Sequence, residues 1–375
     1  MSSADALSDP KRNEAMPGHD MKAISRRDVL GGAAGIAAAA LAGDGAAAAP
    51  GRAPIPYGSA AQIEAFRADA RYRDALVRLC DVIVPMNDLK WEALRHDRAR
   101  FDFSGADELV GFALKHGKAL RGHALLWGMA LPPWARQMAS RAEAERELTR
   151  HIEVVVDRYK GKIATWDVVN EVIAFEPKPG EPYRDTIWQR LLGPDHIEIA
   201  FRTAARVDPK ARLVLNDFNF EEAGPGIVAR RRIAIDIVRR LQDKGIPIHG
   251  VGMQAHLYAE NAIDSEGVQG FVADLGKLGV GVEVTELDVI DWKLPPDTGL
   301  RDRAAAKLVA TYLEAVVAGG RPKAIVTWGL SDRHSWVHET FPRKDPARAR
   351  PLPLDEDYRP KPMMQVLERY RSGRA

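Results

Sequence analysis

Cysteine is nearly absent from this chain, and its scarcity limits how the fold can be held together. Among 375 residues there is one cysteine, Cys80, so no disulfide can form within the chain. The 10 histidines and this cysteine show none of the spacings typical of metal ligands, so the sequence predicts no metal site and no other cofactor. A core must therefore stabilise the fold, and a hydrophobic fraction of 46% can supply one.

The chain also lacks a large excess of either positive or negative charge. Lysine and arginine number 54 against 52 aspartates and glutamates, which gives a formal net charge of +2. Such a balance gives no reason to expect a nucleic acid or an anionic membrane surface as partner. The most apolar stretch near the N-terminus, residues 31–41, is rich in Gly and Ala and too short to span a bilayer.

The first 49 residues differ in composition from the rest of the chain. Arg26 and Arg27 stand ahead of the Ala- and Gly-rich stretch, and a later run of alanines ends at Ala49. A basic pair, an apolar stretch and small residues in this order are typical of a twin-arginine export signal. We therefore divide the chain into an export signal with an N-terminal extension at 1–49 and a globular region at 50–375. A periplasmic or secreted protein is expected.

Short apolar runs alternate with segments of helical periodicity through the globular region. Strands are expected at residues 55–60, 82–86, 119–127, 165–171, 212–216, 250–256, 281–287 and 324–329. Helices are expected between them, at residues 61–79, 106–115, 142–159, 194–207, 226–244, 268–278 and 301–318. This alternation predicts an α/β protein whose parallel strands close into a single-domain (β/α)8 TIM barrel.

Two of the expected strands end in glutamate, Glu171 and Glu286. Catalytic groups of such barrels lie at the C-terminal ends of the strands. A glycosidase needs two carboxyl groups in one cleft, one to protonate the leaving oxygen and one to attack the sugar carbon. Either glutamate alone could equally be a strand-end residue paired with a surface lysine or arginine.

Polar residues beside the two glutamates favour the catalytic interpretation. Asn170 precedes the first glutamate, and Asp288 follows Glu286 by two positions, so strand alternation puts both of these acids on one face. Gln254 and His256 share a face of the preceding strand in the same way, and His256 is placed to bridge the two acids. A lone histidine in an apolar strand is more often a core residue, so His256 gains weight only from these neighbours.

Short strings along the chain, taken together and in order, resemble one known family. They are residues 101–107, 121–123, 166–171, 216–219, 252–257, 285–288, 327–332 and 355–362. Any one string is a weak signal, but their shared order from about residue 54 to residue 370 is similar to glycoside hydrolase family 10, the endo-β-1,4-xylanases. The resemblance implies a secreted, metal-independent, retaining glycosidase. Its expected partner is β-1,4-linked xylan or xylo-oligosaccharide, and we expect it to be a monomer.

The resemblance also implies a role for each residue of the site. Glu171 matches the general acid/base, Glu286 the nucleophile, and Asn170 the donor to the 2-hydroxyl of the sugar under attack. His256, oriented by Asp288, would keep the nucleophile ionised, while burial and the negative nucleophile would raise the pKa of the acid. The two carboxyl groups should lie about 5–5.5 Å apart. The remaining matches are contacts to the sugars, made by Asn87, Lys90, His123, Trp127, Gln254, Trp328 and Trp336.

The sequence departs from the family on the sugar-binding side of the cleft. Met86 stands where the family usually has glutamate, Gly128 and Ala130 lie in a stretch that usually reads His-Ser-Gln, and Phe218 replaces a tyrosine. Each lost hydrogen bond costs about 0.5–1.5 kcal/mol net, so we expect weaker binding of the second sugar on the non-reducing side. Restoring polar groups with Met86→Glu and Gly128→His should then favour xylo-oligosaccharides over aryl xylosides.

Two other functions are compatible with many of these residues. One is a related retaining β-glycosidase with altered glycone specificity, and the other is a carbohydrate-binding barrel without catalytic activity. The joint presence of both glutamates with Asn170, His256 and Asp288 argues against the second. Release of reducing sugar from a panel of β-glycans would separate the three functions.

Replacing both Arg26 and Arg27 by lysine should abolish export, because the twin-arginine route recognises the arginine pair itself. Precursor that retains its N-terminal segment should accumulate in the cytoplasm, as measured by cell fractionation and immunoblotting. Normal secretion of the double variant, with processing near Ala49, would rule this route out.

Overall fold

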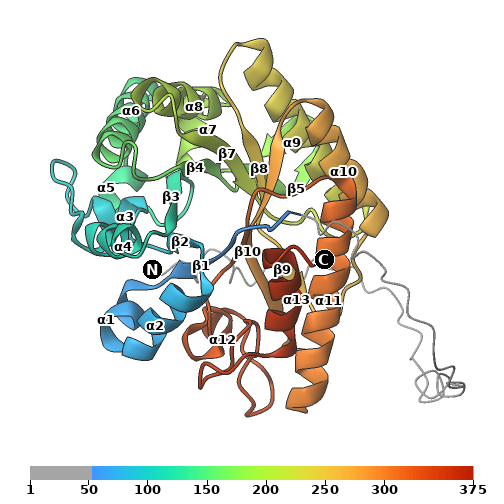
Figure 1. Cartoon of the computed structure of the whole chain (residues 1–375). Coiled ribbons are helices and arrows are strands. Elements are labelled where there is room, and N and C mark those ends of the chain that lie inside the picture. Colours follow the sequence, from blue (N-terminus) through green and yellow to red (C-terminus); the bar gives the residue numbers. More distant parts are fainter. Residues whose placement is uncertain (1–52, 375) are drawn as a thin grey trace, which may run out of the picture.

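Eight parallel strands form a closed barrel in the computed structural model, which describes residues 53–374 (Figure 1). In chain order they are β1 (Tyr57–Ala61), β2 (Val82–Pro85), β3 (Ala119–Trp127), β4 (Thr165–Asn170), β7 (Arg212–Asp217), β8 (Gly250–Met253), β10 (Gly281–Ile290) and β11 (Ile325–Thr327). The last strand, β11, pairs in parallel with both β10 and β1, which closes the ring. The predicted TIM barrel is confirmed, while the expected export signal at 1–49 lies outside the described residues.

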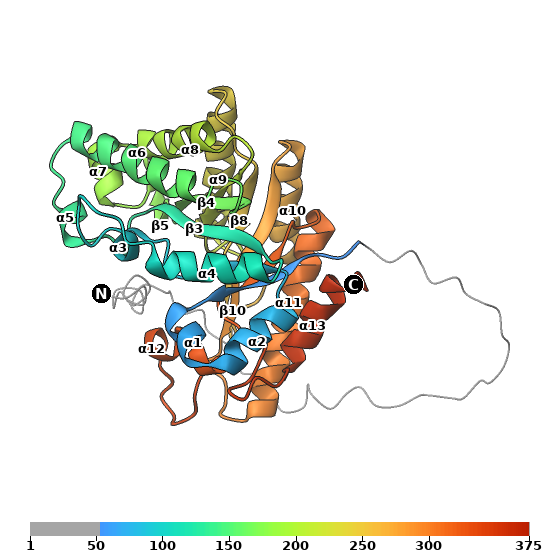
Figure 2. The same cartoon turned by 60° about the vertical axis from the view of Figure 1, so that its left-hand side comes forward.

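Helices surround the barrel, as two views of the molecule show (Figures 1 and 2). The longer ones are α2 (Ala70–Leu79), α4 (Ser104–Lys115), α6 (Arg141–Arg158), α8 (Asp195–Val207), α9 (Pro225–Asp243), α10 (Ser265–Lys277), α11 (Thr298–Gly319) and α13 (Pro362–Arg371). Shorter ones are α1 (Ile63–Ala68), α3 (Trp91–Leu94), α5 (Pro133–Arg136), α7 (Ile187–Leu192), α12 (Val337–Thr340) and the 3-10 helix η3 (Asp332–His334). Within residues 53–374, no helix has the length and apolar character needed to cross a membrane.

Several elements differ from the sequence-based expectation. The helix expected at 61–79 is two helices, because Asp69 adopts an extended conformation and its side chain accepts a hydrogen bond from Arg71 N as the N-cap of α2. The strand expected at 250–256 is broken before β9 (His256–Tyr258), where Ala255 has a φ of 61°. Further elements were not expected: the hairpin of β5 (Ile173–Lys178) with β6 (Glu181–Tyr183), and α13, which packs against α11. The short helices α3, α5, α7, α12 and η3 were not expected either.

The barrel wall is apolar on the side that faces the helices and polar on parts of the side that faces inward. Arg121 from β3 lies inside and forms ion pairs with Asp167 of β4 and Glu283 of β10, all three being at most 4% exposed. Buried charges are tolerated only when they are paired and hydrogen-bonded in this way. The pairing therefore ties three strands together below the edge where the strands end.

A local irregularity in β10 turns two consecutive side chains inward. The pairing register of β10 with β11 shifts between Val284 and Leu287. In a regular strand neighbouring residues point to opposite faces, yet Thr285 and Glu286 both contact the same side chain, that of Asn216 on β7. This shift brings the glutamate expected as nucleophile into the barrel mouth.

Candidate active site

All the site residues predicted from the sequence come together at the C-terminal ends of the barrel strands. A small cavity of about 20 Å³ is lined by Lys90, His123, Trp127, Asn170, Glu171, His256, Glu286, Trp328 and Trp336. The other three adjoin it through hydrogen bonds: Asn87 to Lys90, Gln254 to Glu171, and Asp288 to His256. Their roles remain predictions, but their placement in one cleft agrees with the expectation for an α/β barrel enzyme.

Glu286 is buried and contacts two hydrogen-bonding side chains. Asn216 Nδ2 donates to its Oε1 at 2.6 Å, and His256 Nε2 lies 3.4 Å from its Oε2. The orientation of Asn216 is fixed in turn, because Thr285 Oγ1 donates to the Asn216 amide oxygen at 2.7 Å. Both oxygens of the Glu286 carboxyl group are therefore held in place by neighbouring side chains.

His256 joins Glu286 to a second buried carboxylate. Its Nδ1 is 2.8 Å from Asp288 Oδ1, and Trp336 Nε1 donates to the other oxygen of Asp288 at 2.7 Å. Burial alone would lower the pKa of His256, but Asp288 and Glu286 outweigh it and raise the pKa to about 10. The imidazole is therefore a cation at neutral pH and donates to both acids. The break at Ala255 does not separate His256 from them, because β9 pairs with the end of β10, where His256 and Asp288 are partners.

Asn170 has its amide oxygen occupied by neighbouring side chains. Asn216 Nδ2 donates to this oxygen at 2.8 Å and Gln254 Nε2 at 3.3 Å. The amino group of Asn170, which lines the cavity, is left as a donor for a ligand. Gln254 also donates to Glu171 Oε1 at 3.2 Å, so it bridges Asn170, the last residue of β4, and Glu171, which follows it.

Glu171 sits at a strained turn and pairs with a cation that sequence reasoning missed. Its backbone φ is 54°, in the left-handed region that few residues other than glycine adopt, and such strain is concentrated at functional sites. Arg184 Nη1 lies 2.5 Å from its Oε2. Burial raises the pKa of Glu171, but attraction to Arg184 and the hydrogen bond from Gln254 bring it below the usual value. The expected rise in the pKa of Glu171 is therefore wrong.

Lys90 brings a positive charge against the aromatic walls. Its Nζ donates to Asn87 Oδ1 at 2.8 Å and lies 4.9 Å from the ring centre of Trp127 and 5.7 Å from that of Trp328. Burial lowers the pKa of Lys90 to about 8, even though Glu286 and Glu171 act in the opposite direction. The indole N–H of Trp127 is buried without a partner among the described residues, so a ligand hydroxyl is a suitable acceptor for it.

His123 is held in place by Asp167, one of the buried charged residues inside the barrel. Its Nδ1 is 3.0 Å from Asp167 Oδ2, and its ring meets the ring of Trp328 edge-on at 4.9 Å. Asp167 and Asn216 were not assigned roles from the sequence, although Asn216 opens one of the family strings. Arg184 had no sequence signal, since it follows a hairpin that was not expected.

The departures from the family pattern are accommodated by packing. Met86 is 2% exposed in an apolar cluster with Val84, Val326 and Trp328. Gly128 has no room for a side chain, because a Cβ there would lie 2.2 Å from Cγ2 of Thr186, the N-cap of α7. The Gly128→His change that we expected to restore binding would therefore collide with α7, and that restoring test is corrected.

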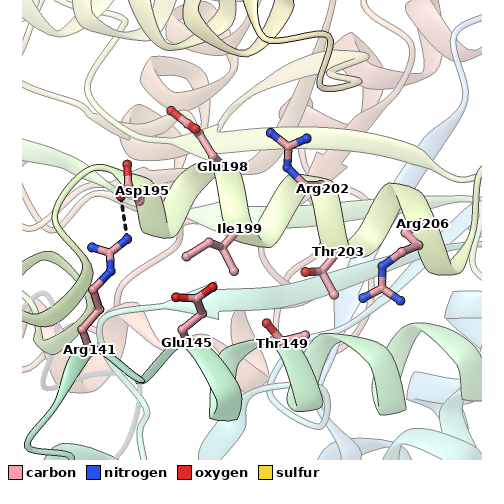
Figure 3. A pocket seen from close by; sticks show the side chains of 9 residues that line it. All are labelled: Arg141, Glu145, Thr149, Asp195, Glu198, Ile199, Arg202, Thr203 and Arg206. Carbon is pink, nitrogen blue, oxygen red and sulfur yellow. Dashed lines mark hydrogen bonds and ion pairs between the residues drawn. The ribbon is translucent and has the colours of Figure 1, made fainter. Parts of the chain in front are cut away.

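A larger hollow lies outside the barrel, between α6 and α8 (Figure 3). Its volume is about 390 Å³, and the residues that line it include no aromatic ring. At one end Arg141 and Asp195 face each other and form an exposed ion pair at 2.6 Å. Sugars stack on aromatic faces, and none of the predicted site residues lies here, so the smaller cavity remains the candidate site. Among the described residues, no group of His, Cys, Asp and Glu side chains is arranged to hold a metal ion.

The fold and the cleft together define a glycoside hydrolase with a (β/α)8 barrel. The family model for glycosyl hydrolase family 10 matches residues 46–369. Endo-1,4-beta-xylanase B of Thermotoga neapolitana is 33% identical over 293 residues, which cover 78% of this chain and 81% of that protein. A beta-1,4-xylanase of Dictyoglomus thermophilum is 35% identical over 306 residues, covering 77% and 82%.

Solved structures agree with these sequence relatives. The crystal structure of xylanase 10B from Thermotoga petrophila in complex with xylobiose superimposes with a TM-score of 0.78 at 29% identity, covering 86% of this chain and 95% of that one. The chain therefore belongs to glycosyl hydrolase family 10, and it is an endo-1,4-β-xylanase.

Asp288→Asn should lower kcat/KM by roughly 10- to 150-fold at neutral pH, the loss expected for one charge-assisted hydrogen bond. Without the Asp288 charge the pKa of His256 falls from about 10, so the imidazole loses its proton and Glu286 loses a cationic partner. The pH dependence of kcat/KM measures this, and activity should recover as the pH is lowered. Asp185→Asn, at an exposed carboxylate, is the control. Equal activity of Asp288→Asn and the parent enzyme would contradict the assignment.

Gly128→Ala should destabilise the protein by about 1–3 kcal/mol, because its Cβ would overlap Thr186. Thr186→Ser removes the overlapping methyl group and keeps the hydroxyl that caps α7, so this change alone should be nearly neutral. The double variant should regain most of the lost free energy of unfolding, measured by urea denaturation. If Gly128→Ala is as stable as the parent, the packing account of this position fails.

Proposed function

We propose that this xylanase cleaves β-1,4-linked xylan or xylo-oligosaccharide by a retaining double displacement, with Glu286 as nucleophile and Glu171 as general acid/base. The observation that carries the proposal is the unequal setting of the two carboxyl groups. Glu286 is fixed between Asn216 and a cationic His256, as a nucleophile that must stay ionised requires. Glu171 stands at the turn after β4 and contacts a side chain that is partly open to solvent.

In the first step Glu171 donates its proton to the glycosidic oxygen while Glu286 attacks the anomeric carbon. The bond between this carbon and the leaving oxygen breaks, and a covalent glycosyl-enzyme ester forms. Asn170 donates from its free amino group to the sugar 2-hydroxyl, a contact that strengthens as positive charge develops on the ring. In the second step Glu171 takes a proton from water, whose oxygen attacks the same carbon and releases Glu286.

The aromatic and basic side chains of the cleft support a sugar ligand on the non-reducing side. Trp127, Trp328 and Trp336 surround the cavity and offer flat faces to pyranose rings, while Lys90 and His123 supply polar contacts between them. The related xylanase 10B from Thermotoga petrophila has been solved with xylobiose, which supports a short β-1,4-xylose chain as the ligand here.

We also propose that the enzyme acts outside the cytoplasm, as a monomer. The twin-arginine pattern before residue 50 supports export. The cavity is lined by residues of one chain, so a single copy supplies every group that the mechanism above uses.

The first product released from an aryl β-xyloside or a xylo-oligosaccharide should have the β configuration, because two displacements at one carbon restore the starting stereochemistry. Proton NMR of the anomeric signals in the first minutes, before mutarotation, measures it. An initial α product would point to inversion, for which the carboxyl groups would need to lie about 6.5–9.5 Å apart to admit a water molecule.

Two substitutions separate the proposed roles. Glu286→Ala should inactivate the enzyme on every substrate, because no ester can form. Glu171→Ala should lose activity on xylan but still form the ester from a dinitrophenyl xyloside, whose leaving group needs no proton. If both variants lost activity equally on that substrate, the acid/base assignment would be wrong.

A further inference from the structure

An arginine side chain holds the carboxyl group of the proposed acid of this enzyme. Arg184 Nη1 lies 2.5 Å from Glu171 Oε2, and their side chains are 22% and 5% exposed. Among the described residues, Arg184 is the only cationic side chain within ion-pair distance of this carboxylate. A carboxylate paired with a guanidinium stays ionised, whereas a general acid has to carry a proton when the leaving oxygen departs.

The hairpin of β5 and β6 explains how Arg184 reaches the catalytic glutamate. The chain leaves the barrel directly after Glu171 and returns along β6, so that Ile173 pairs with Tyr183. The next residue, Arg184, is fixed by its backbone N–H, which donates to Val172 O at 2.9 Å. This contact sets Arg184 beside the residue that follows Glu171 in the chain.

Other charges near Glu171 come from several elements and are tied to partners of their own. Lys90, after β2, donates to Asn87, and Glu286 on β10 is engaged by Asn216 and His256. Asp217 at the end of β7 is paired at 2.5 Å with Arg230 of α9, and both are fully buried. These arrangements are internal to the site and leave Arg184 as the group whose removal most changes the surroundings of Glu171.

We propose that Arg184 is a positioning residue for the acid step, which holds Glu171 as a carboxylate while the cleft is empty and releases it when the leaving-group end of the substrate enters. This rests on the proposed role of Glu171 as general acid. As the guanidinium moves away, Glu171 takes up one proton from solvent and can then donate it to the glycosidic oxygen. Arg184 keeps its own charge throughout and exchanges no proton.

The contacts of Arg184 allow this release. Among residues 53–374 its guanidinium makes one hydrogen bond, to Glu171, and lies 5.8 Å from the ring centre of Phe218, so leaving the carboxylate breaks one hydrogen bond. The side chain is partly open to solvent, which can hydrate the guanidinium once it leaves the carboxylate. Burial of Glu171, which favours the protonated form, is then no longer opposed.

The test is the pH dependence of kcat/KM for Arg184→Gln on a xylo-oligosaccharide. The alkaline limb of this profile reports loss of the acid proton in the free enzyme. Without the guanidinium the pKa of Glu171 rises, so the alkaline limb should move upward by about 1–3 pH units, while the acidic limb stays in place. A role confined to folding the loop would lower activity at every pH and leave the limb where it was.

Three comparisons make the result specific. Arg190→Gln removes the same charge from an exposed arginine on α7 that pairs with Asp185, and its profile should match the parent. Arg184→Lys keeps a cation near Glu171, so its alkaline limb should lie between those of the parent and Arg184→Gln. With a dinitrophenyl xyloside, which needs no proton, Arg184→Gln should show no upward shift of the limb.

The outcomes distinguish this inference from the proposed function beneath it. If Glu171→Gln retains the alkaline limb, Glu171 is not the acid, and both proposals fall. If Glu171→Gln abolishes the limb but Arg184→Gln leaves it unmoved, the acid assignment stands and the role of Arg184 is refuted. An upward shift in Arg184→Gln, absent from Arg190→Gln, supports the role of Arg184.

Discussion

One unbroken chain of hydrogen bonds across the mouth of the barrel determines the arrangement of the site. It runs from Glu171 through Gln254 to the oxygen of Asn170, and from there through Asn216 to Glu286. It continues from Glu286 through His256 and Asp288 to Trp336. Each polar atom is buried, so each needs a partner, and satisfying one side chain fixes the orientation of the next. Replacing any side chain in this chain of hydrogen bonds would therefore change the surroundings of both carboxylates.

The barrel backbone has to depart from regular geometry to build this chain. Glu171 and Ala255 take positive φ angles, and β10 shifts its register between Val284 and Leu287. Each such departure costs free energy, of order 1–3 kcal/mol for a residue other than glycine in a sparsely populated region. The ion pairs of Arg121 with Asp167 and Glu283 lie beneath and tie β3, β4 and β10 together. A rigid, closed ring of strands can hold strained residues that an open sheet edge would relax.

The sequence was sufficient for the barrel and for the acids at its mouth, because both depend on strand periodicity and on the shared C-terminal edge of parallel strands. The sugar-contacting residues around these acids came from the family resemblance. It was not sufficient for groups whose position depends on irregular backbone. Arg184 reaches Glu171 only because an unexpected hairpin folds back on β4. The sequence also does not show that a side chain at position 128 would collide with Thr186, because this depends on where α7 begins. The expected direction of the Glu171 pKa shift was wrong for the same reason, because burial was anticipated and the neighbouring Arg184 was not.

The two carboxylates each face a cation, and the difference between those cations separates their roles. His256 is held on both ring nitrogens, by Glu286 and by a fully buried Asp288 that Trp336 fixes in turn. It cannot leave without stranding a buried charge, so Glu286 keeps its cationic neighbour. Within the described part of the chain, the guanidinium of Arg184 makes one hydrogen bond, and its side chain is partly exposed to solvent. A fixed cation suits a group that must never take a proton, and a movable one suits a group that must gain and lose a proton in every turnover.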